Sequence, residues 1–346
     1  MTKFSSLALA GVAFAGLALS ASADSLDRTG SLLLYPLFDN NRGGIFTISV
    51  TNTNSDTNPG SGQLLAGTVD VEFVYVNGLD CLEFNRTRRL TPNDTLPVTT
   101  RFDNPNQTEG YVYVFAKSPT TGKAIKWDWL AGDSFHVAPG IVGGVDIPPV
   151  VFRAASGLAS GANTDVDNDG VRDLNGNEYE KVSDELLVPR FLSYKQGITN
   201  PQLILIGLTG KSFTTIVNFL VYNDNEEVFS AQYAFDCWDR EDLDSVSGVF
   251  TDTFLRTSNE NVSEYVQFLG NMAPPAGLPN VVEYGWYRMD GAVAFSTAAS
   301  VQDPAFLAVH VDRSDYTDVA GASLPYGLGE QTNGDLIQHG PFPDAN

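Results

Sequence analysis

The residues with the clearest chemical signature form a short acidic stretch near the middle of the chain, at residues 165–173. Carboxylates alternate along it in the pattern DxDxDGxxD, and further amides and a glutamate follow. Oxygen atoms at alternate positions let one loop wrap a hard cation, and the glycine permits the sharp turn that such a loop needs. The stretch therefore predicts a calcium site, whose expected ligands are Asp165, Asp167, Asp169, the backbone carbonyl of Val171, Asp173, and Glu178 or Asn177.

Over roughly residues 164–178, this stretch resembles the calcium loops of thrombospondin type 3 repeats, dockerins and EF-hands. It departs from the EF-hand at the twelfth loop position, where Gly176 replaces the bidentate glutamate. The small residues of 154–164 do not predict the helix that would precede an EF-hand loop. The resemblance implies a calcium loop without flanking helices. The alternative is a solvated acidic linker, since Asp, Asn and Gly also favour turns.

Length and charge limit the classes of protein that this chain can belong to. It has 346 residues, which favours two domains, and a formal net charge of −22 from 42 acidic and 20 basic side chains. A surface of that charge repels nucleic acid and anionic membranes, so neither is an expected partner. No stretch after the N-terminal segment has enough uninterrupted apolar residues to span a membrane.

The N-terminus has the features of an export signal. Lys3 provides the positive charge, residues 7–19 form a short apolar core, and Ala21-Ser22-Ala23 fits the small-residue cleavage rule. We therefore predict a signal peptide at 1–23, cleavage after Ala23, and a secreted or periplasmic protein. In such an oxidising compartment the two cysteines, Cys81 and Cys237, are expected to form a disulfide.

Most of the remaining chain consists of short alternating, β-branched or aromatic stretches between turn signals, which is typical of β-strands. Four segments of the first half recur in the same order in the second half. They are LLYPLF at 33–38 and LLVPRF at 186–191, VEFVYVN at 71–77 and VNFLVYN at 217–223, CLE at 81–83 and CWD at 237–239, and GYVY at 110–113 and GWYR at 285–288. The matches favour an internal duplication over chance similarity between strands.

We therefore predict an all-β protein with two tandem, internally duplicated β-sandwich modules. Module 1 is expected at 24–137 and module 2 at 184–313. A Gly, Pro and Asn-rich connector at 138–183 joins them and contains the acidic loop, and a Gly and Pro-rich tail follows at 314–346.

The sequence contains no recognisable catalytic motif. The three histidines, His136, His310 and His339, lack metal-ligand spacing, and neither a GxSxG elbow nor a phosphate-binding loop occurs. The prediction is a non-catalytic surface, adhesive or matrix-type protein, whose partner is a cell surface, a matrix or a polysaccharide. Its oligomeric state is left open. The alternative is a secreted carbohydrate-active protein, a sugar-binding module or a hydrolase, which uses exposed aromatic side chains to stack on sugar rings.

Overall fold

The structure is a computed structural model that describes residues 28–41, 44–137, 145–209, 214–223, 226–255, 283–293, 304–314 and 319–336. The predicted signal peptide lies outside these ranges. The described chain is mostly β-strand in several antiparallel sheets, as predicted. Its helical segments are single turns: α1 (Thr100–Asp103), α2 (Leu243–Val246), α3 (Asp252–Leu255), η2 (Ser61–Gln63) and η3 (Gly248–Phe250). None of the helices in these ranges is long and apolar enough to cross a membrane.

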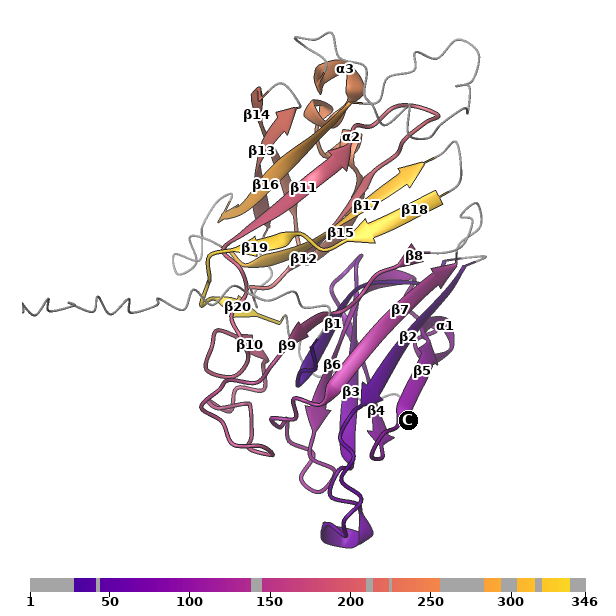
Figure 1. Ribbon diagram of the computed structural model, residues 1–346, viewed down its shortest axis with the longest axis vertical. Helices are drawn as coiled ribbons and strands as arrows, with labels where there is room; N and C mark the ends of the chain where they lie inside the picture. Colours follow the sequence, from indigo (N-terminus) through magenta and orange to yellow (C-terminus); the bar gives the residue numbers. More distant parts are fainter. Residues whose placement is uncertain are drawn as a thin grey trace, which may run out of the picture.

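The first half of the chain forms a five-stranded and a four-stranded antiparallel sheet, shown in indigo and purple in Figure 1. The strand orders are β4-β3-β6-β1-β9 and β5-β2-β7-β8. The strands are β1 (Leu32–Asp39), β2 (Ile45–Asn52), β3 (Val69–Asn77), β4 (Glu83–Leu90), β5 (Thr95–Thr99), β6 (Glu109–Lys117), β7 (Leu130–Val137), β8 (Val145–Asp146) and β9 (Val150–Phe152). Phe46, Ile48 and Val50 of β2 are buried at alternate positions, because the side chains of a strand alternate between its two faces.

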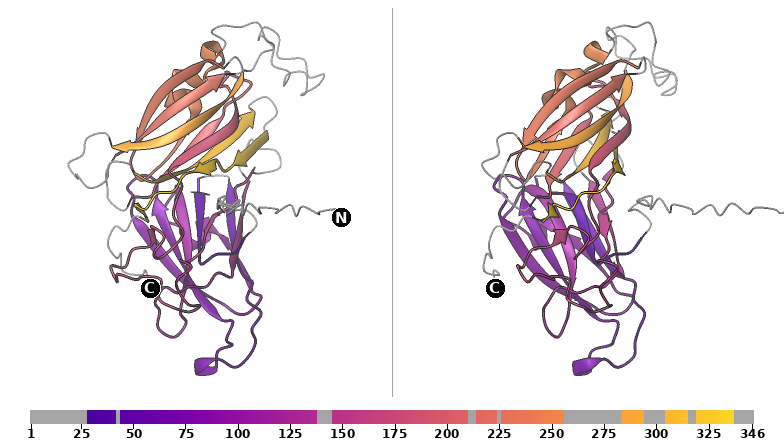
Figure 2. Two further views of the ribbon diagram at one scale, coloured as in Figure 1. Left: turned by 60° about the vertical axis from the view of Figure 1, so that its left-hand side comes forward. Right: turned by 90° about the vertical axis from the view of Figure 1, so that its left-hand side faces the viewer.

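The second half also forms a five-stranded and a four-stranded sheet, of orders β14-β13-β16-β11-β19 and β15-β12-β17-β18. When β1 to β9 are matched one by one with β11 to β19, the strand orders of the two halves are identical. The strands are β11 (Glu185–Leu192), β12 (Gln202–Gly207), β13 (Thr215–Asn223), β14 (Val228–Phe235), β15 (Trp238–Asp242), β16 (Tyr284–Val293), β17 (Phe306–Ser314), β18 (Val319–Ser323) and β19 (Tyr326–Leu328). The two halves follow each other along the long axis of the molecule (Figure 2).

The recurring prolines and glycines have the same local role in both halves. The register of β1 with β6 shifts between Tyr35 and Phe38, across Pro36, and that of β11 with β16 shifts across Pro189. Proline has no N–H to donate to a ladder, so a bulge at this position is the expected response. At Gly110, a Cβ atom would lie 2.0 Å from the carbonyl oxygen of Val76.

The sheets extend beyond the domain boundaries that the sequence predicted. The strands β8 and β9 lie in the predicted connector, but they pair with β7 and β1 of the first half. The strands β18 and β19 lie in the predicted tail, but they pair with β17 and β11. These four strands have two to five residues each. Such short strands carry too few residues for a detectable alternation, so the sequence pattern did not indicate them.

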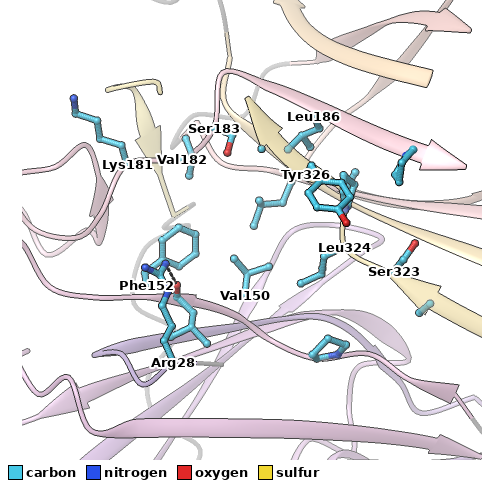
Figure 3. A pocket seen from close by; sticks show the side chains of 18 of the residues that line it. Arg28, Val150, Phe152, Lys181, Val182, Ser183, Leu186, Ser323, Leu324 and Tyr326 are labelled. Atoms are coloured by element: carbon cyan, nitrogen blue, oxygen red, sulfur yellow. Dashed lines mark hydrogen bonds between the residues drawn. The ribbon is translucent and has the colours of Figure 1, made fainter. Parts of the chain in front are cut away.

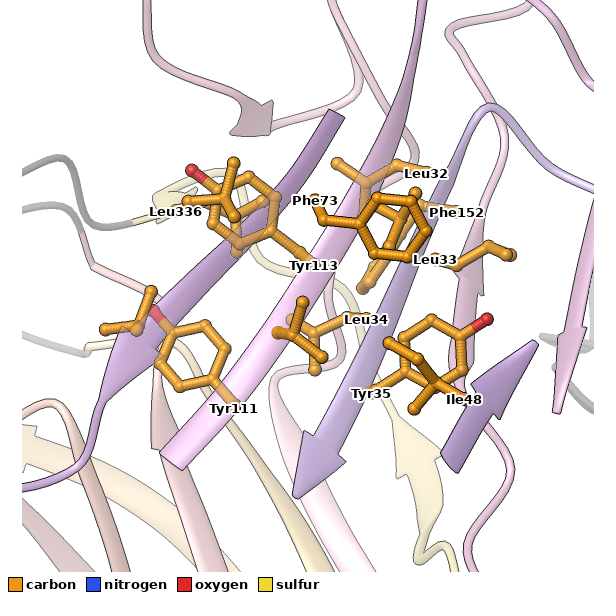
Figure 4. Close-up of a cluster of buried hydrophobic side chains, with 14 of the residues drawn as sticks. Leu32, Leu33, Leu34, Tyr35, Ile48, Phe73, Tyr111, Tyr113, Phe152 and Leu336 are labelled. Carbon is orange, nitrogen blue, oxygen red and sulfur yellow. The ribbon is translucent and has the colours of Figure 1, made fainter. Parts of the chain in front are cut away.

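The rest of the predicted connector covers the outer face of the first five-stranded sheet. Leu34 and Tyr111 are fully buried there, and Leu174 and Tyr179 belong to the same hydrophobic cluster. The short strand β10 (Asp173–Leu174) pairs with β20 (Gly334–Asp335), and Leu336 joins the cluster from the C-terminal end (Figure 4). Residues 153–182 are therefore packed against the first half, and are not a free linker between the two halves.

The two halves are tied together at one junction. Cys81 and Cys237 lie at disulfide distance, with Cα atoms 6.1 Å apart, as the sequence predicted. The Trp238 indole donates a hydrogen bond to a first-half backbone carbonyl at 3.0 Å. Arg240 forms ion pairs with Asp39 at 2.9 Å and with Glu109 at 2.6 Å. One hydrophobic cluster also runs through both halves, so their contact is a packed interface.

Candidate metal centre

Three acidic side chains converge in the segment that covers the first sheet. Carboxylate oxygens of Asp165, Asp167 and Glu178 all lie within 4.8 Å of one another. Asp165 is half-buried, Asp167 is exposed and Glu178 is buried. Calcium–oxygen bonds are about 2.3–2.6 Å long, so oxygens up to about 5 Å apart can share one ion. The triad is therefore close enough to hold a metal ion.

The loop is curled by hydrogen bonds from its own backbone to its own side chains. The Asp169 amide donates to Asp167 at 3.2 Å, and the Val171 amide donates to Asp169 at 2.8 Å. Asn168 and Gly170 have φ values of 64° and 87°, in the left-handed region that Asn and Gly tolerate best. These turns bring the carboxylates of Asp165 and Asp167 to one side of the loop.

Glu178 closes the loop from its far end. Its carboxylate accepts hydrogen bonds from the backbone amides of Val166 at 2.5 Å and Asp173 at 3.2 Å. Burial raises the pKa of Glu178 to about 7, although both of these hydrogen bonds act in the opposite direction. Desolvation without a full countercharge disfavours the carboxylate form. A bound cation would supply that charge and release the proton.

Arg172 fixes the loop to the sheet beneath it. Its buried guanidinium lies 3.5 Å from the Asp165 carboxylate and 5.1 Å from the centre of the Phe115 ring on β6. The buried Tyr179 hydroxyl and the Thr164 hydroxyl are 3.0 Å apart, which holds the ends of the loop together. The site has three carboxylates and one guanidinium, which leaves an excess of negative charge for a cation.

The other acidic residues of the predicted site lie outside this group. The Asp169 carboxylate accepts the Val171 amide, and the Asp173 carboxylate accepts the Asn175 side-chain amide at 2.8 Å. Burial and then the nearby carboxylates of Asp169 and Asp167 raise the pKa of Asp173. Asp173 belongs to β10, which pairs with β20, a contact more than 150 residues distant in sequence that loop spacing does not reveal.

Two further predicted ligands are the backbone carbonyl of Val171 and the side chain of Asn177. The Asn177 backbone amide donates to the Asn175 side chain at 2.7 Å. The carbonyl of Val171 and the side chain of Asn177 stay predicted ligands. Glu178 and Asn177 were alternatives from the sequence alone, and only Glu178 is part of the triad. Arg172 was not among the predicted site residues, although a lone arginine inside an acidic loop was a usable signal.

A separate cavity of about 530 Å³ lies where the two halves meet (Figure 3). Its wall includes apolar side chains of both halves, such as Phe152 and Leu186, together with Tyr326. The charged residues of the wall are all basic, and each has an acidic partner: Arg28 with Glu180 at 2.8 Å, Lys181 with Glu330 at 3.1 Å, and Arg190 with Asp312 at 2.7 Å. The described residues that line this wall include no carboxylate, and the acidic side chains beside it are paired with its basic residues.

The two described histidines are buried within the fold. His310 lies 3.1 Å from the Tyr287 hydroxyl and 3.0 Å from the Asp312 carboxylate, and it is buried. His136 is also buried, 4.0 Å from the Asp39 carboxylate. The third histidine lies outside the described residues.

Comparisons of the chain with protein-family models, with curated proteins and with solved structures find no match.

Proposed function

We propose that this chain is an exported calcium-binding protein with a non-catalytic, adhesive or matrix-type role outside the cell. The observation that carries the proposal is the convergence of Asp165, Asp167 and Glu178, one of them buried with its pKa raised by burial to about 7. Buried carboxylates without a full countercharge are costly, and a cation is the simplest compensation.

The chemistry of the donors favours calcium among the metals. The triad offers only oxygen ligands, with no His or Cys, which disfavours zinc and copper. Magnesium demands a near-ideal octahedron at short distances and keeps several waters, whereas calcium accepts an irregular loop. Calcium is also the ion expected at millimolar concentration outside a cell, where the export signal would deliver the protein.

Calcium would stabilise the segment that covers the outer face of the first five-stranded sheet. Residues 153–182 lie over β1 and β6, and the triad closes the loop at the centre of this segment. An ion that binds the folded loop and not the unfolded chain stabilises the fold by mass action. The proposed role of the ion is therefore structural: it keeps this cover in place and with it the path of the chain into the second half.

The proposed architecture is two tandem β-sandwich modules that arose by internal duplication. Its support is the matching order of strands, the register shift across each proline, and the corresponding places of His136 and His310 on β7 and β17. Two rigid sandwiches with a packed junction suit a protein that presents surfaces to a cell-surface, matrix or polysaccharide partner.

Calcium binding can be tested by isothermal titration of the mature, metal-free protein. Wild type should bind one calcium ion. Asp167→Asn should weaken binding by at least tenfold, because it removes one of three carboxylates and leaves the shape of the loop unchanged. Asp94→Asn, in a first-half turn far from the loop in sequence, is the matched control and should bind like wild type. No heat from wild type at millimolar calcium, or equal affinities for all three proteins, would contradict the proposal.

A sugar-binding role is the second candidate, and one observation favours it. On β13 and β16, the rings of Tyr222 and Trp286 are parallel with centroids 3.9 Å apart, and both side chains are only partly buried. Leu220, on the same face of β13, is 43% exposed. Affinity electrophoresis in gels that contain soluble polysaccharides would test this role, since Trp286→Ala should abolish any retardation that wild type displays.

A further inference from the structure

The strand β14 is an edge of the second five-stranded sheet, and in Figure 1 it lies at the outer side of that sheet. Among the described strands it pairs with β13 only. Its eight residues, 228–235, pair with β13 without a register shift. A strand with one neighbour leaves the N–H and C=O groups of every second residue unpaired on its other side.

This edge lacks the features that normally prevent sheets from adding to one another. Its sequence, VFSAQYAF, contains no charged residue and no proline, and its register has no bulge. Natural edge strands are commonly protected by charges, prolines or bulges. In a chain with a net charge of −22, this eight-residue edge strand offers a second copy a stretch of backbone without charged side chains along its own length.

The corresponding edge of the first half is protected. The strand β4 occupies the position in its sheet that β14 occupies in the second sheet. It carries Glu83, Arg86, Arg88 and Arg89. Arg88 and Arg89 form ion pairs with acidic residues of the same half, so β4 presents a fixed pattern of charge at its edge. The two halves share a strand order and differ in this protection.

The inner face of β14 is also incompletely buried. Phe229, Ala231 and Tyr233 pack against the second hydrophobic core, but all three remain partly exposed. The outward residues of the strand are exposed, including Val228 at 52%. A further strand beside β14 would cover the three inward residues and extend the core across the new seam.

We infer that β14 pairs antiparallel with β14 of a second copy of this chain, which joins two five-stranded sheets into one continuous sheet. Residues 228–235 are self-complementary in a register centred on Ala231, and the acidic Glu226 and Asp236 face each other just beyond the two ends of the paired strands. There, Phe229 faces Tyr233 of the second copy on the inner side, and Ser230 faces Gln232 on the outer side. Directly opposed aromatic and polar pairs of this kind are the units that stabilise antiparallel sheets.

Sedimentation velocity of the mature protein over a series of concentrations tests the pairing. Wild type should sediment as a monomer–dimer equilibrium. Added salt should shift it toward the dimer, because screening weakens the repulsion between two acidic chains. An association driven by ion pairs would respond in the opposite direction.

Two double variants test the register. Ser230→Lys with Gln232→Lys places like charges opposite each other at the seam and should give a monomer. Ser230→Lys with Gln232→Glu places opposite charges there and should retain the dimer. Asn85→Lys with Thr87→Lys, at the corresponding positions of β4, is the control and should sediment like wild type. All four positions carry polar side chains that are exposed or partly exposed, and circular dichroism checks that each variant is folded.

Several outcomes would overturn the inference. The first is a wild type that is monomeric at every concentration, and the second is a Ser230→Lys, Gln232→Lys variant that still forms dimers. The third is a Ser230→Lys, Gln232→Glu variant that is as monomeric as the variant with two lysines. The fourth is a β4 control variant that loses the dimer. Calcium binding is measured separately, so a failure here leaves the proposed calcium site untouched.

Discussion

Removal of the Cys81–Cys237 bridge should lower the free energy of unfolding by several kcal/mol. The perturbation is the double variant Cys81→Ala with Cys237→Ala. Alanine is preferred to serine because Cys237 is only 4% exposed, and serine would place a hydroxyl group in this buried position. The two cysteines are separated by 156 residues, so the bridge closes a long loop in the unfolded chain. Long loops restrict the unfolded state most, which is where a disulfide mainly acts.

The magnitude follows from the length of that loop. In the chain-entropy relation, a loop of 156 residues lowers the entropy of the unfolded state by about 17 cal/mol/K, or about 5 kcal/mol at 25 °C. Measured effects usually fall below this value, so we expect a loss of about 3–5 kcal/mol. The packed junction itself, including the Trp238 hydrogen bond and the Arg240 ion pairs, should survive in the folded variant.

Urea denaturation followed by tryptophan fluorescence measures this change. The oxidised wild type, the reduced wild type and the double variant should be compared, and the last two should agree. Thiol titration of the folded wild type is the control and should find no reactive thiol. A double variant within about 1 kcal/mol of the oxidised wild type, where ordinary substitutions fall, would refute the reasoning. Two reactive thiols in the folded protein would refute it as well.

Three further predictions concern the sheets, the junction and the loop. Gly110→Ala should destabilise the fold by about 1–3 kcal/mol in urea melts, because the new Cβ would overlap the Val76 carbonyl oxygen. Gly157→Ala, with open space around it, should cost less. Arg240→Leu should cost about 2 kcal/mol, because it removes the arginine partner of the largely buried Asp39 carboxylate, and equal stability in thermal melts would contradict this. The metal-free protein should melt at a higher temperature at about pH 5.5 than at about pH 8. Burial raises the folded-state pKa of Glu178 to about 7, so the stability present at acidic pH is lost as pH rises through that value. Saturating calcium, or the variant Glu178→Gln, should reduce this difference in melting temperature.

Local pattern alone predicted much of the architecture. The residue types of 71–77 and 217–223 indicated strands, and the two segments form the last seven residues of β3 and of β13. The recurring Leu-Leu-x-Pro-x-Phe segments also form strands, β1 and β11, and both contain a register shift at the proline. The strands could be predicted because a strand with one face toward a core must alternate in polarity.

The metal site could be predicted only in part. The spacing of Asp165 and Asp167 follows from local turns, and both belong to the triad. Glu178 joins them because the chain turns back at Gly176, where φ is 89°. Asp173 is a predicted ligand outside the triad, and it pairs with Asp335 in β10. Ligand spacing in one loop cannot reveal a partner strand from the other end of the chain.

The sequence by itself determined the strand-rich class, the cysteine pair and the position of the acidic loop, because each depends on residue types at short range or on a count. Only the tertiary structure decided which acids converge, which strands lie at the edges, and which sheet face is covered by residues 153–182. The edge strands and the covered sheet face depend on segments that meet across more than a hundred residues, such as β10 with β20 and β11 with β19. Their pairing is chosen by the burial of whole faces and the closure of long loops, and neither quantity is contained in a local pattern.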